Sequence, residues 1–257
     1  MSADNDAAWP WEDSPVCLIT GSAGGLGRAV GEALARRGAT VLLSARDPAK
    51  AAAAAAGAAR PAGEGAGALR SMPAGLDVAD AASVDAAARA VADLAGRLDV
   101  LINNAAYVDW GETATGADLT TSRAVMDTNL YGTWRMIQAF LPLLRRSDHP
   151  RIVNVASGAG SHGDKQYGLT ARRGAAASYG ISKAAVLALT ATVAAELDGT
   201  PVIVNAVDPD LTATWPGAEA MGARPVSASM PGIVWAATLP DDGPRGGFFR
   251  DGRPHPW

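Results

Sequence analysis

A tyrosine and a lysine, Tyr179 and Lys183, stand four residues apart at the start of an apolar run that extends to Leu197. At helical spacing, side chains at positions i and i+4 project from one face, so the phenol and the ammonium would point toward the same place. A lysine held near a tyrosine favours the phenolate and lowers the tyrosine pKa, which acid–base chemistry near neutral pH requires. Taken alone, such a pair is more often a packed ring beside a solvated charge, so its meaning depends on the rest of the chain.

The composition excludes several classes of partner and site. The 257 residues carry 22 Lys and Arg scattered among 26 Asp and Glu, a net charge of -4, which argues against nucleic acid as a partner. The single cysteine, Cys17, lies in an apolar run, so we expect a buried thiol, no disulfide and no metal. The first residues have neither a basic nor an apolar segment, and we expect no later run long enough to cross a bilayer. We therefore expect a cytoplasmic protein without membrane contact.

Short apolar runs alternate with segments of helical spacing along the chain. Strands are expected at 16–20, 40–43, 69–76, 100–102, 152–155, 202–207 and 247–249, and helices at 28–37, 49–59, 81–95, 131–144, 175–197 and 228–237. This alternation predicts an α/β fold, a single Rossmann-type domain with a doubly wound, mostly parallel sheet of about seven strands. Ligands of such sheets bind at the carboxyl ends of the strands.

Three segments lie outside this regular pattern. Residues 1–13 are predicted to be a flexible tail, although Trp9 and Trp11 are costly to leave in water and are expected to pack on the domain or a partner. The domain itself is expected to span 14–257. Segments 158–178 and 211–230 are predicted to be substrate loops, the second of them a short mobile lid.

A glycine-rich loop joins the first strand to the first helix. Gly21, Gly25 and Gly27 would permit a tight turn there and let backbone N–H groups and the helix N-terminus approach a pyrophosphate. We assign Ser22 and Leu26 of the same loop to this cofactor site. Tight turns use glycine for other reasons as well, so the position between strand and helix carries the prediction.

The residues after the second strand indicate which cofactor binds. Proteins that bind NAD place an acid here for the ribose hydroxyls, but this chain reads Ser44-Ala45-Arg46-Asp47. Arg46 offers a planar cation that suits a 2′-phosphate, which favours NADP(H). The alternative is a surface ion pair between Arg46 and Asp47, which would contribute little.

Two further strand ends complete the predicted cofactor site. Asp77 could accept a hydrogen bond from an adenine amino group while Val78 packs on the ring, or Asp77 could cap the following helix. Asn104, Ala105 and Ala106 follow the fourth strand, where small residues let the backbone pass close to the cofactor.

Together these pieces resemble the short-chain dehydrogenase/reductase family, from about residue 15 to the end of the chain. The family's TGxxxGxG, NNAG and YxxxK motifs match Thr20 to Gly27, Asn103 to Ala106 and Tyr179 to Lys183, and its asparagine and serine match Asn129 and Ser157. The text VLLSARD and the ending GGFFRDGRPHPW are similar to the carbonyl-reductase-like branch, whose members typically use NADPH.

The resemblance implies a role for each matched residue. Ser157 would hydrogen-bond the substrate oxygen, Tyr179 would donate a proton to it, and Lys183 would hold the nicotinamide ribose and tune the tyrosine. Asn129 would fix a water that resupplies the proton. Pro209, Leu211 and Thr214 are assigned to the nicotinamide end, Thr214 as the family's carboxamide-binding threonine.

The chain departs from the family pattern at three places. Asp210 stands where the family has glycine beside the nicotinamide, which puts the local backbone geometry in question, and Ala106 replaces the last glycine of NNAG. The segment 158–178 is long and carries the cations His162, Lys165, Arg172 and Arg173. These cations would meet an acidic substrate or belong to a solvated loop, and we favour the solvated loop.

The sequence therefore predicts an NADPH-dependent oxidoreductase that reduces a ketone or aldehyde to an alcohol, or runs the reverse reaction, on a small molecule. Two alternatives stay open. One is an isomerase or dehydratase with no net redox change, which is suggested by the charged Asp210 beside the nicotinamide. The other is a binding protein that senses NADP without turnover. The helix 175–197 could form a homo-oligomer interface, but the loop before Tyr179 would obstruct it, so dimer, tetramer and monomer all remain open.

Overall fold

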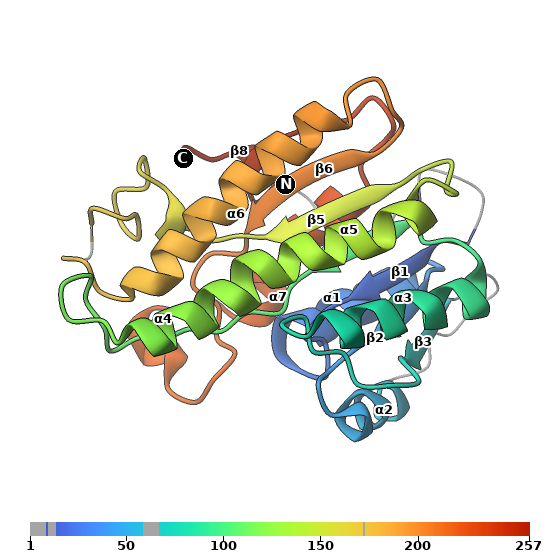
Figure 1. The fold of residues 1–257 in the computed structure, drawn as a ribbon, viewed down its shortest axis with the longest axis horizontal. Coiled ribbons are helices and arrows are strands. Elements are labelled where there is room, and N and C mark those ends of the chain that lie inside the picture. The colour runs from blue at the N-terminus through green and yellow to red at the C-terminus, as the bar shows by residue number, and fades with distance from the viewer. Residues whose placement is uncertain (1–8, 10–13, 59–66, 172) are drawn as a thin grey trace.

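A mostly parallel sheet of eight strands forms the centre of the molecule, in the order β3-β2-β1-β4-β5-β6-β7-β8 (Figure 1). The computed structural model describes residue 9 and residues 14–58, 67–171 and 173–257. The strands are β1 (Val16–Ile19), β2 (Thr40–Leu43), β3 (Ala68–Ser71), β4 (Val100–Asn103), β5 (Arg151–Val155), β6 (Ile203–Asp208), β7 (Phe248–Arg250) and β8 (Arg253–Pro254). All neighbours pair in parallel except β7 and β8. The predicted fold class is confirmed, and β8 adds a short antiparallel return.

Helices cover both faces of this sheet because successive residues of its strands point to opposite sides. Cys17 and Ile19 of β1 belong to one apolar cluster, and Leu18 between them belongs to the other. The first cluster packs on α1 (Gly25–Arg36) and α7 (Val226–Ala237). The second packs on α3 (Ala81–Ala95), α5 (Thr133–Leu144) and α6 (Ala177–Glu196). Burial on both faces explains why the strands read as continuous apolar runs.

Three local features differ from the sequence prediction. β3 ends at Ser71 instead of continuing to residue 76, and Pro73, which has no N–H to donate to a ladder, follows two residues later. A helix that was not predicted, α4 (Leu119–Met126), is capped by Asp118, whose side chain accepts from the N–H groups of Thr120 and Thr121. It continues into a π-helix, Asp127–Gly132, and then into α5. The predicted helix at 49–59 is α2 (Pro48–Ala56).

The N-terminal segment contributes one side chain to the core. Trp9 is buried and belongs to the apolar cluster under α1 and α7, which confirms that it packs on the domain. The other residues of the predicted tail, Trp11 among them, lie outside the described residues, as do residues 61–66 of the predicted loop.

Helix α6 is long and apolar enough to cross a bilayer by length and composition, with a mean hydropathy of 1.3 over its window. The expectation that no run reaches this length was therefore wrong. Half of that window is buried inside the molecule, and Leu189 and Val193 of the helix belong to the same apolar cluster as Val204 of β6. This is the placement of a core helix, and in this structure α6 serves to carry Tyr179 and Lys183.

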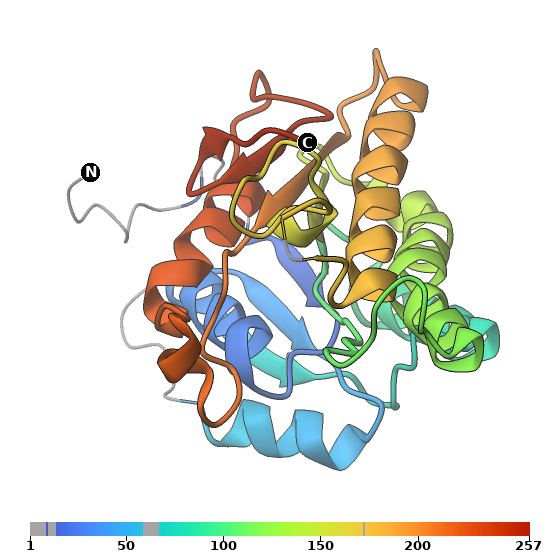
Figure 2. The same ribbon diagram turned by 90° about the vertical axis from the view of Figure 1, so that its left-hand side faces the viewer.

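The loops that follow the strands gather at one end of the molecule, which faces the viewer in Figure 2. There the loop after β5 lies beside the C-terminal segment, and Ser161 donates a hydrogen bond to the carbonyl of Pro256. These two residues are 95 positions apart in the chain, so distant segments meet next to the strand ends.

Candidate active site

A cleft of about 1630 Å³ runs along the carboxyl ends of the strands. It exceeds the usual volume of a site for one drug-sized ligand, which leaves room for a dinucleotide and a second molecule. Most of the predicted site residues line it: Gly21, Gly25, Leu26, Gly27, Arg46, Asp77, Val78, Asn104, Ala105, Ala106, Ser157, Tyr179, Lys183, Pro209, Leu211 and Thr214. Among the predicted residues, Ser22 and Asn129 are not part of this lining.

The glycine loop at one end of the cleft needs glycine for its backbone conformation and, at Gly27, for space. Gly21 and Gly25 have φ of +63° and +53°, in the left-handed region that glycine favours. A Cβ at Gly27 would lie 2.7 Å from Nδ2 of Asn104, which itself donates to the carbonyls of Thr20 and Gly21. No side chain caps the N-terminus of α1, so its N–H groups remain available to an anion. The loop therefore fits the pyrophosphate of a dinucleotide.

Ser22 supports this loop from inside the fold. Its hydroxyl donates to the carbonyl of Ile19 at 2.8 Å and accepts from the N–H of Ser44 at 2.9 Å, and the residue is fully buried. These bonds tie the ends of β1 and β2 together. The side chain of Ser22 thus fixes the glycine loop and does not face the cleft to which we had assigned it.

Tyr179 and Lys183 lie in the first two turns of α6 and both face the cleft. Lys183 is buried, its Nζ donates to the carbonyl of Val155 at 2.6 Å, and it lies 5.7 Å from the centroid of the Tyr179 ring. Burial lowers the pKa of Lys183 to about 8, against the opposing effect of the nearby Asp208 carboxylate. The ammonium is therefore held beside the phenol at neutral pH, as the spacing predicted.

The start of α6 is fixed by Glu112, a buried residue that the sequence did not single out. Its backbone carbonyl accepts from the N–H of Ala176, and its carboxylate accepts from the N–H of Ser178. A carboxylate at a helix N-terminus is favoured by the helix dipole. Because Ala176 also adopts φ of +49°, the entry into α6 is sharply defined about two turns before Lys183. Tyr179 is held by this anchored first turn.

Ser157 follows β5 and begins the short 3-10 turn Gly158–Gly160. Its Oγ accepts from the N–H of Ala159 at 3.1 Å, which leaves the O–H free to donate into the cleft. The turn lies against α6, because a Cβ at Gly160 would be 2.4 Å from the N of Ala184. Ser157 and the Tyr179–Lys183 pair are therefore placed by two backbones in direct contact.

Asn129 lies in the π-helix and is buried behind the cleft. Its side chain accepts from the N–H of Tyr107 and donates to the carbonyl of Tyr107 and to Oγ of Ser182, at 2.7 to 2.9 Å. Both amide hydrogens are thereby used within the protein. The structure thus gives Asn129 the role of a clamp between the segment after β4 and α6, and the predicted water contact stays a prediction.

Asp210 adopts a left-handed backbone conformation that glycine favours. Its φ is +61°, and its Oδ1 accepts from the N–H of the next residue, Leu211, at 2.7 Å. Aspartate is one of the few residues that tolerate this region, because a short polar side chain can bond locally. Asp210 lines the cleft, so its carboxylate lies at the reacting end.

Several cleft residues were not predicted. The ring centroid of Trp110 lies 6.1 Å from that of Tyr179 and 5.5 Å from that of Trp215, so aromatic rings border the reacting end. No local sequence motif indicates Trp110, whereas Asp208 could have been found as an acid at a strand end. The loop cations His162, Lys165 and Arg173 are exposed and absent from the cleft lining, as the solvated-loop alternative expected; Arg172 lies outside the described residues.

Comparisons with known proteins agree with this geometry. The model of the short chain dehydrogenase family matches residues 15–221. A rhamnolipids biosynthesis 3-oxoacyl-(acyl-carrier-protein) reductase from Pseudomonas aeruginosa is 34% identical over 200 residues, which cover 76% of this chain and 71% of the relative.

Solved structures share the fold. A 3-oxoacyl-(acyl-carrier protein) reductase with bound NAD from Brucella melitensis matches with a TM-score of 0.79 at 26% identity, over 97% of this chain and 94% of that one. A short chain dehydrogenase from Shigella flexneri complexed with NADP matches with a TM-score of 0.77 at 24% identity, over 97% and 100%. The chain belongs to the short chain dehydrogenase family, whose members are oxidoreductases that use a nicotinamide cofactor.

Proposed function

We propose that this protein is an NADPH-dependent oxidoreductase that reduces a ketone or aldehyde to an alcohol, or oxidises the alcohol in the reverse direction. The observation that carries the proposal is the convergence of Ser157, Tyr179 and Lys183 on one cleft whose other end is the glycine loop. A reductase needs a proton donor and a dinucleotide site along one groove, and these residues would supply both. We also propose that the protein belongs to the carbonyl-reductase-like branch and acts in the cytoplasm.

Each residue of the reacting end has a role that fits its surroundings. The bound nicotinamide would supply or accept the hydride. Ser157 would donate a hydrogen bond to the substrate oxygen, and Tyr179 would transfer its phenolic proton to that oxygen. Lys183 would stabilise the phenolate left on Tyr179, because its ammonium is held beside the ring by the Val155 carbonyl.

The preference for NADP(H) rests on the residues after β2. Asp47, the acid that follows Arg46, uses its Oδ1 to cap α2 by accepting from the N–H of Ala49 at 2.9 Å. Arg46 and Lys50 line the cleft beside it, so two cations face this end. A 2′-phosphate carries the charge that such a pair binds. Because the related structures hold NAD in one case and NADP in the other, cofactor choice has to be measured on this chain.

Arg46→Ala is expected to weaken NADPH binding about 10- to 100-fold and to leave NADH binding within about twofold, because only NADPH has the phosphate that Arg46 would contact. Dissociation constants from fluorescence titration of both cofactors would measure this. Arg89→Ala, an exposed arginine of α3 outside the cleft, is the matched control and should change neither value. Equal losses for NADPH and NADH in Arg46→Ala would contradict the phosphate contact.

A screen of small carbonyl compounds that follows NADPH absorbance tests the proposed activity directly. Substrate-dependent NADPH consumption supports a reductase. Turnover of a substrate without net NADPH consumption would instead identify an isomerase or dehydratase. Tight NADPH binding with no turnover across the panel would identify a binding protein, and the presence of Ser157, Tyr179 and Lys183 in one cleft argues against that outcome.

We further propose that the protein assembles as a homo-oligomer through the outer face of α4 and α5. Leu119, Tyr131 and Trp134 on this face are 67%, 50% and 43% exposed, a large apolar area for a monomer to leave in water. Light scattering at micromolar concentration is expected to give at least a dimer mass, and Trp134→Asp is expected to lower it to that of one chain. A monomer mass for the unmodified protein would contradict the interface.

A further inference from the structure

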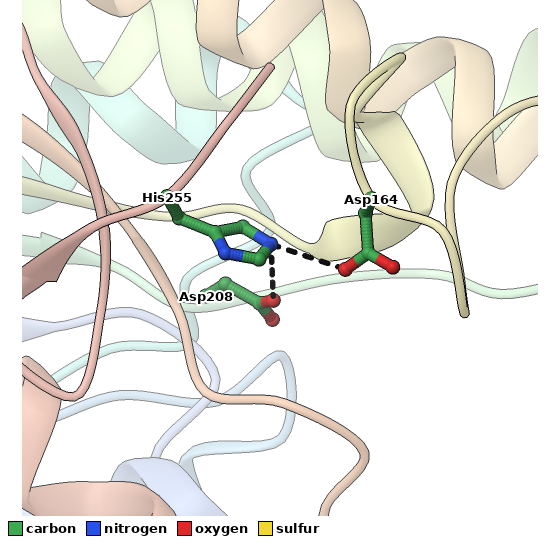
Figure 3. A group of neighbouring side chains, drawn as sticks. All are labelled: Asp164, Asp208 and His255. Carbon is green, nitrogen blue, oxygen red and sulfur yellow. Dashed lines mark hydrogen bonds and ion pairs between the residues drawn. The ribbon is translucent and has the colours of Figure 1, made fainter.

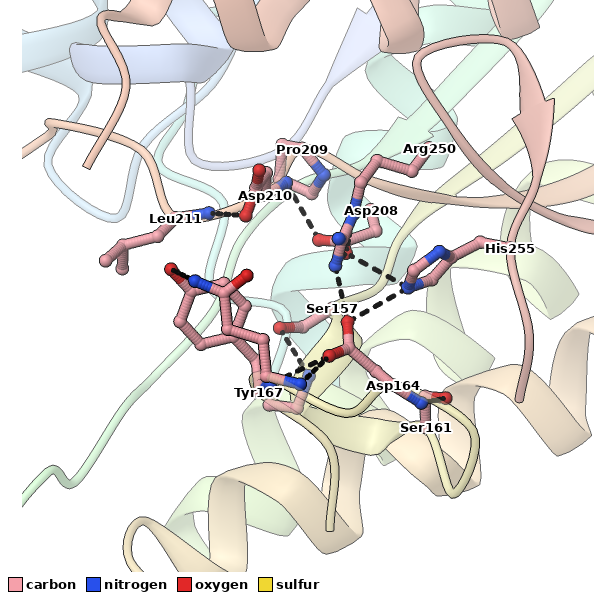
Figure 4. Close-up of polar contacts among 12 residues, drawn as sticks. Ser157, Ser161, Asp164, Tyr167, Asp208, Pro209, Asp210, Leu211, Arg250 and His255 are labelled. Atoms are coloured by element: carbon pink, nitrogen blue, oxygen red, sulfur yellow. Dashed lines mark hydrogen bonds and ion pairs between the residues drawn. The ribbon is translucent and has the colours of Figure 1, made fainter. Parts of the chain in front are cut away.

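Two aspartates, an arginine and a histidine form a closed network behind Ser157 (Figure 4); Figure 3 shows the two aspartates and the histidine. Arg250 of β7 bonds Asp164 of the loop after β5 at 2.7 Å, and it bonds Asp208 at the end of β6 through Nε at 2.8 Å and through Nη2. His255 contributes Nε2, 3.1 Å from Asp164 and 3.9 Å from Asp208. The network thus joins the C-terminal segment, the loop after β5 and the end of β6.

The cation of this network is the arginine. Asp164, Asp208 and His255 present ligand atoms within 4.8 Å of one another, an arrangement that could hold a metal ion. The Arg250 guanidinium, however, already bonds both carboxylates, so a divalent ion would have to displace it or lie beside a positive charge. The geometry therefore favours a structural ion-pair network.

Asp164 links the network to the cleft. Its Oδ2 meets Arg250 and His255, while its Oδ1 accepts from the N–H groups of Gln166 and Tyr167 at 2.8 and 2.7 Å. Tyr167 in turn lines the cleft. Burial would raise the pKa of Asp164, but these backbone bonds and Arg250 outweigh it and lower the pKa to about 2. The carboxylate is thus charged at neutral pH, and both of its oxygens are in use.

The network also touches the reacting end through the backbone. A Cβ at Gly158, the residue after Ser157, would lie 2.5 Å from Oδ2 of Asp164 and 2.6 Å from Nη2 of Arg250. Asp208 uses its other oxygen to accept from the N–H of Asp210 at 2.9 Å. The Arg250 guanidinium therefore lies against the turn that follows Ser157. Through the Asp164 carboxylate it holds the backbone of Tyr167, and through the Asp208 carboxylate it holds the backbone of Asp210.

We propose that Arg250 is a positioning residue, which fixes the loop after β5 and the turn after β6 so that Ser157 and Tyr167 keep their places around the substrate. The inference rests on the proposed reductase activity for its catalytic consequence. The contacts between the C-terminal segment and the loop add to it, since Ser161 donates to the carbonyl of Pro256 at 2.6 Å. Residues near the C-terminus thus hold the loop after β5, which in turn contributes Tyr167 to the cleft.

Arg250→Met tests this positioning role, because it keeps an unbranched side chain and removes the guanidinium. We expect KM for an accepted carbonyl substrate to rise about tenfold and kcat/KM to fall about 10- to 100-fold, the scale on which misplaced groups lower rates. We also expect trypsin to cleave after the exposed Lys165 about tenfold faster while the far-ultraviolet circular dichroism stays native. Arg250→Lys, which retains one cation, should give intermediate values.

Arg97→Met is the matched control, because Arg97 also pairs with a buried acid, Asp99, but at the start of β4. It should lower stability without changing KM or cleavage at Lys165 by more than about twofold. Unchanged cleavage and KM in Arg250→Met, or equal changes in both variants, would overturn the proposal. So would a rise in melting temperature on adding Zn²⁺ or Mn²⁺ that Asp164→Asn abolishes, which would make the cluster a metal site.

The double variant Asp164→Asn with Arg250→Met separates a network from independent effects. If Arg250 acts through Asp164, the double variant should lose little more than Arg250→Met alone; fully additive losses would overturn that route. The proteolysis readout needs no turnover, so it tests the positioning of the loop even if no carbonyl substrate is accepted. Failure of the proposed reductase function and failure of this inference are thus distinguishable.

Discussion

Tyr179→Phe is expected to lower the rate of hydride transfer to a carbonyl substrate by about 10²- to 10⁴-fold, the usual contribution of a positioned proton donor. Phenylalanine keeps the ring beside Trp110 and Lys183 and removes only the hydroxyl. The fold and the cofactor site should therefore be unaffected, and NADPH affinity should stay within about twofold. Single-turnover measurements with pre-bound NADPH, together with a cofactor titration, would separate the two effects.

The control for this experiment is Tyr131→Phe, which removes a phenolic hydroxyl from the exposed face of the π-helix. It should leave hydride transfer unchanged. A Tyr179→Phe variant as active as Tyr131→Phe would show that the proton comes from another group, and the assignment of Tyr179 would then be wrong.

Lys183→Met is expected to lower kcat/KM by at least about 100-fold, because the phenolate of Tyr179 would lose the cation that stabilises it. The same change should make the protein more stable at pH 7. Burial lowers the pKa of Lys183 from 10.5 to about 8, which means that the fold holds its ammonium at a cost. The carbonyl of Val155 loses a donor in the variant, which offsets part of the gain.

The pH dependence of stability gives the sign of this effect. Between about pH 8 and 10.5 the unfolded chain binds the lysine proton more tightly than the folded protein does, so the stability of the unmodified protein rises with pH in that window. The advantage of Lys183→Met should therefore be largest at pH 7 and shrink toward pH 10. Denaturant midpoints at the two pH values would measure it. An equal difference at both would show that Lys183 is not a buried cation.

The order of strands and helices could be predicted because it depends on local patterns, namely short apolar runs and segments of helical spacing. The glycine loop, the strand end at Arg46 and the pair Tyr179 and Lys183 each depend on a few neighbouring residues. Parallel sheets bring strand ends together, so these separate motifs could be assigned to one cleft. Helix α4 was missed because its eight residues have no strong apolar period, although Asp118 at its N-cap was a signal.

The charged network could not have been predicted in the same way. Arg250 lies 42 residues from Asp208 and 86 residues from Asp164 in the chain. Asp208 stands out as an acid at a strand end, but nothing in the segments of Asp164 and Arg250 distinguishes these two from ordinary surface charges. Only the docking of the C-terminal segment on the loop after β5 makes them neighbours. The roles of Ser22 and Asn129 depend likewise on which side their helix or loop turns toward the sheet, and spacing alone does not determine that.

The π-helix Asp127–Gly132 has a consequence for how the chain tolerates insertion and deletion. A π-turn holds one more residue than an α-turn, so it corresponds to a one-residue insertion between α4 and α5. A π-turn and an α-turn each complete one rotation about the axis, so deleting a residue there would leave an α-turn and keep nearly the same face of α5 toward the sheet. The same deletion inside the regular part of α5 would rotate everything beyond it by roughly 100° about the axis. A deletion in the π-helix would therefore disturb Asn129, which is buried against Ser182, and leave Trp134 exposed on the outer face. The π-helix thus separates the clamp behind the cleft from the helical register of the outer surface.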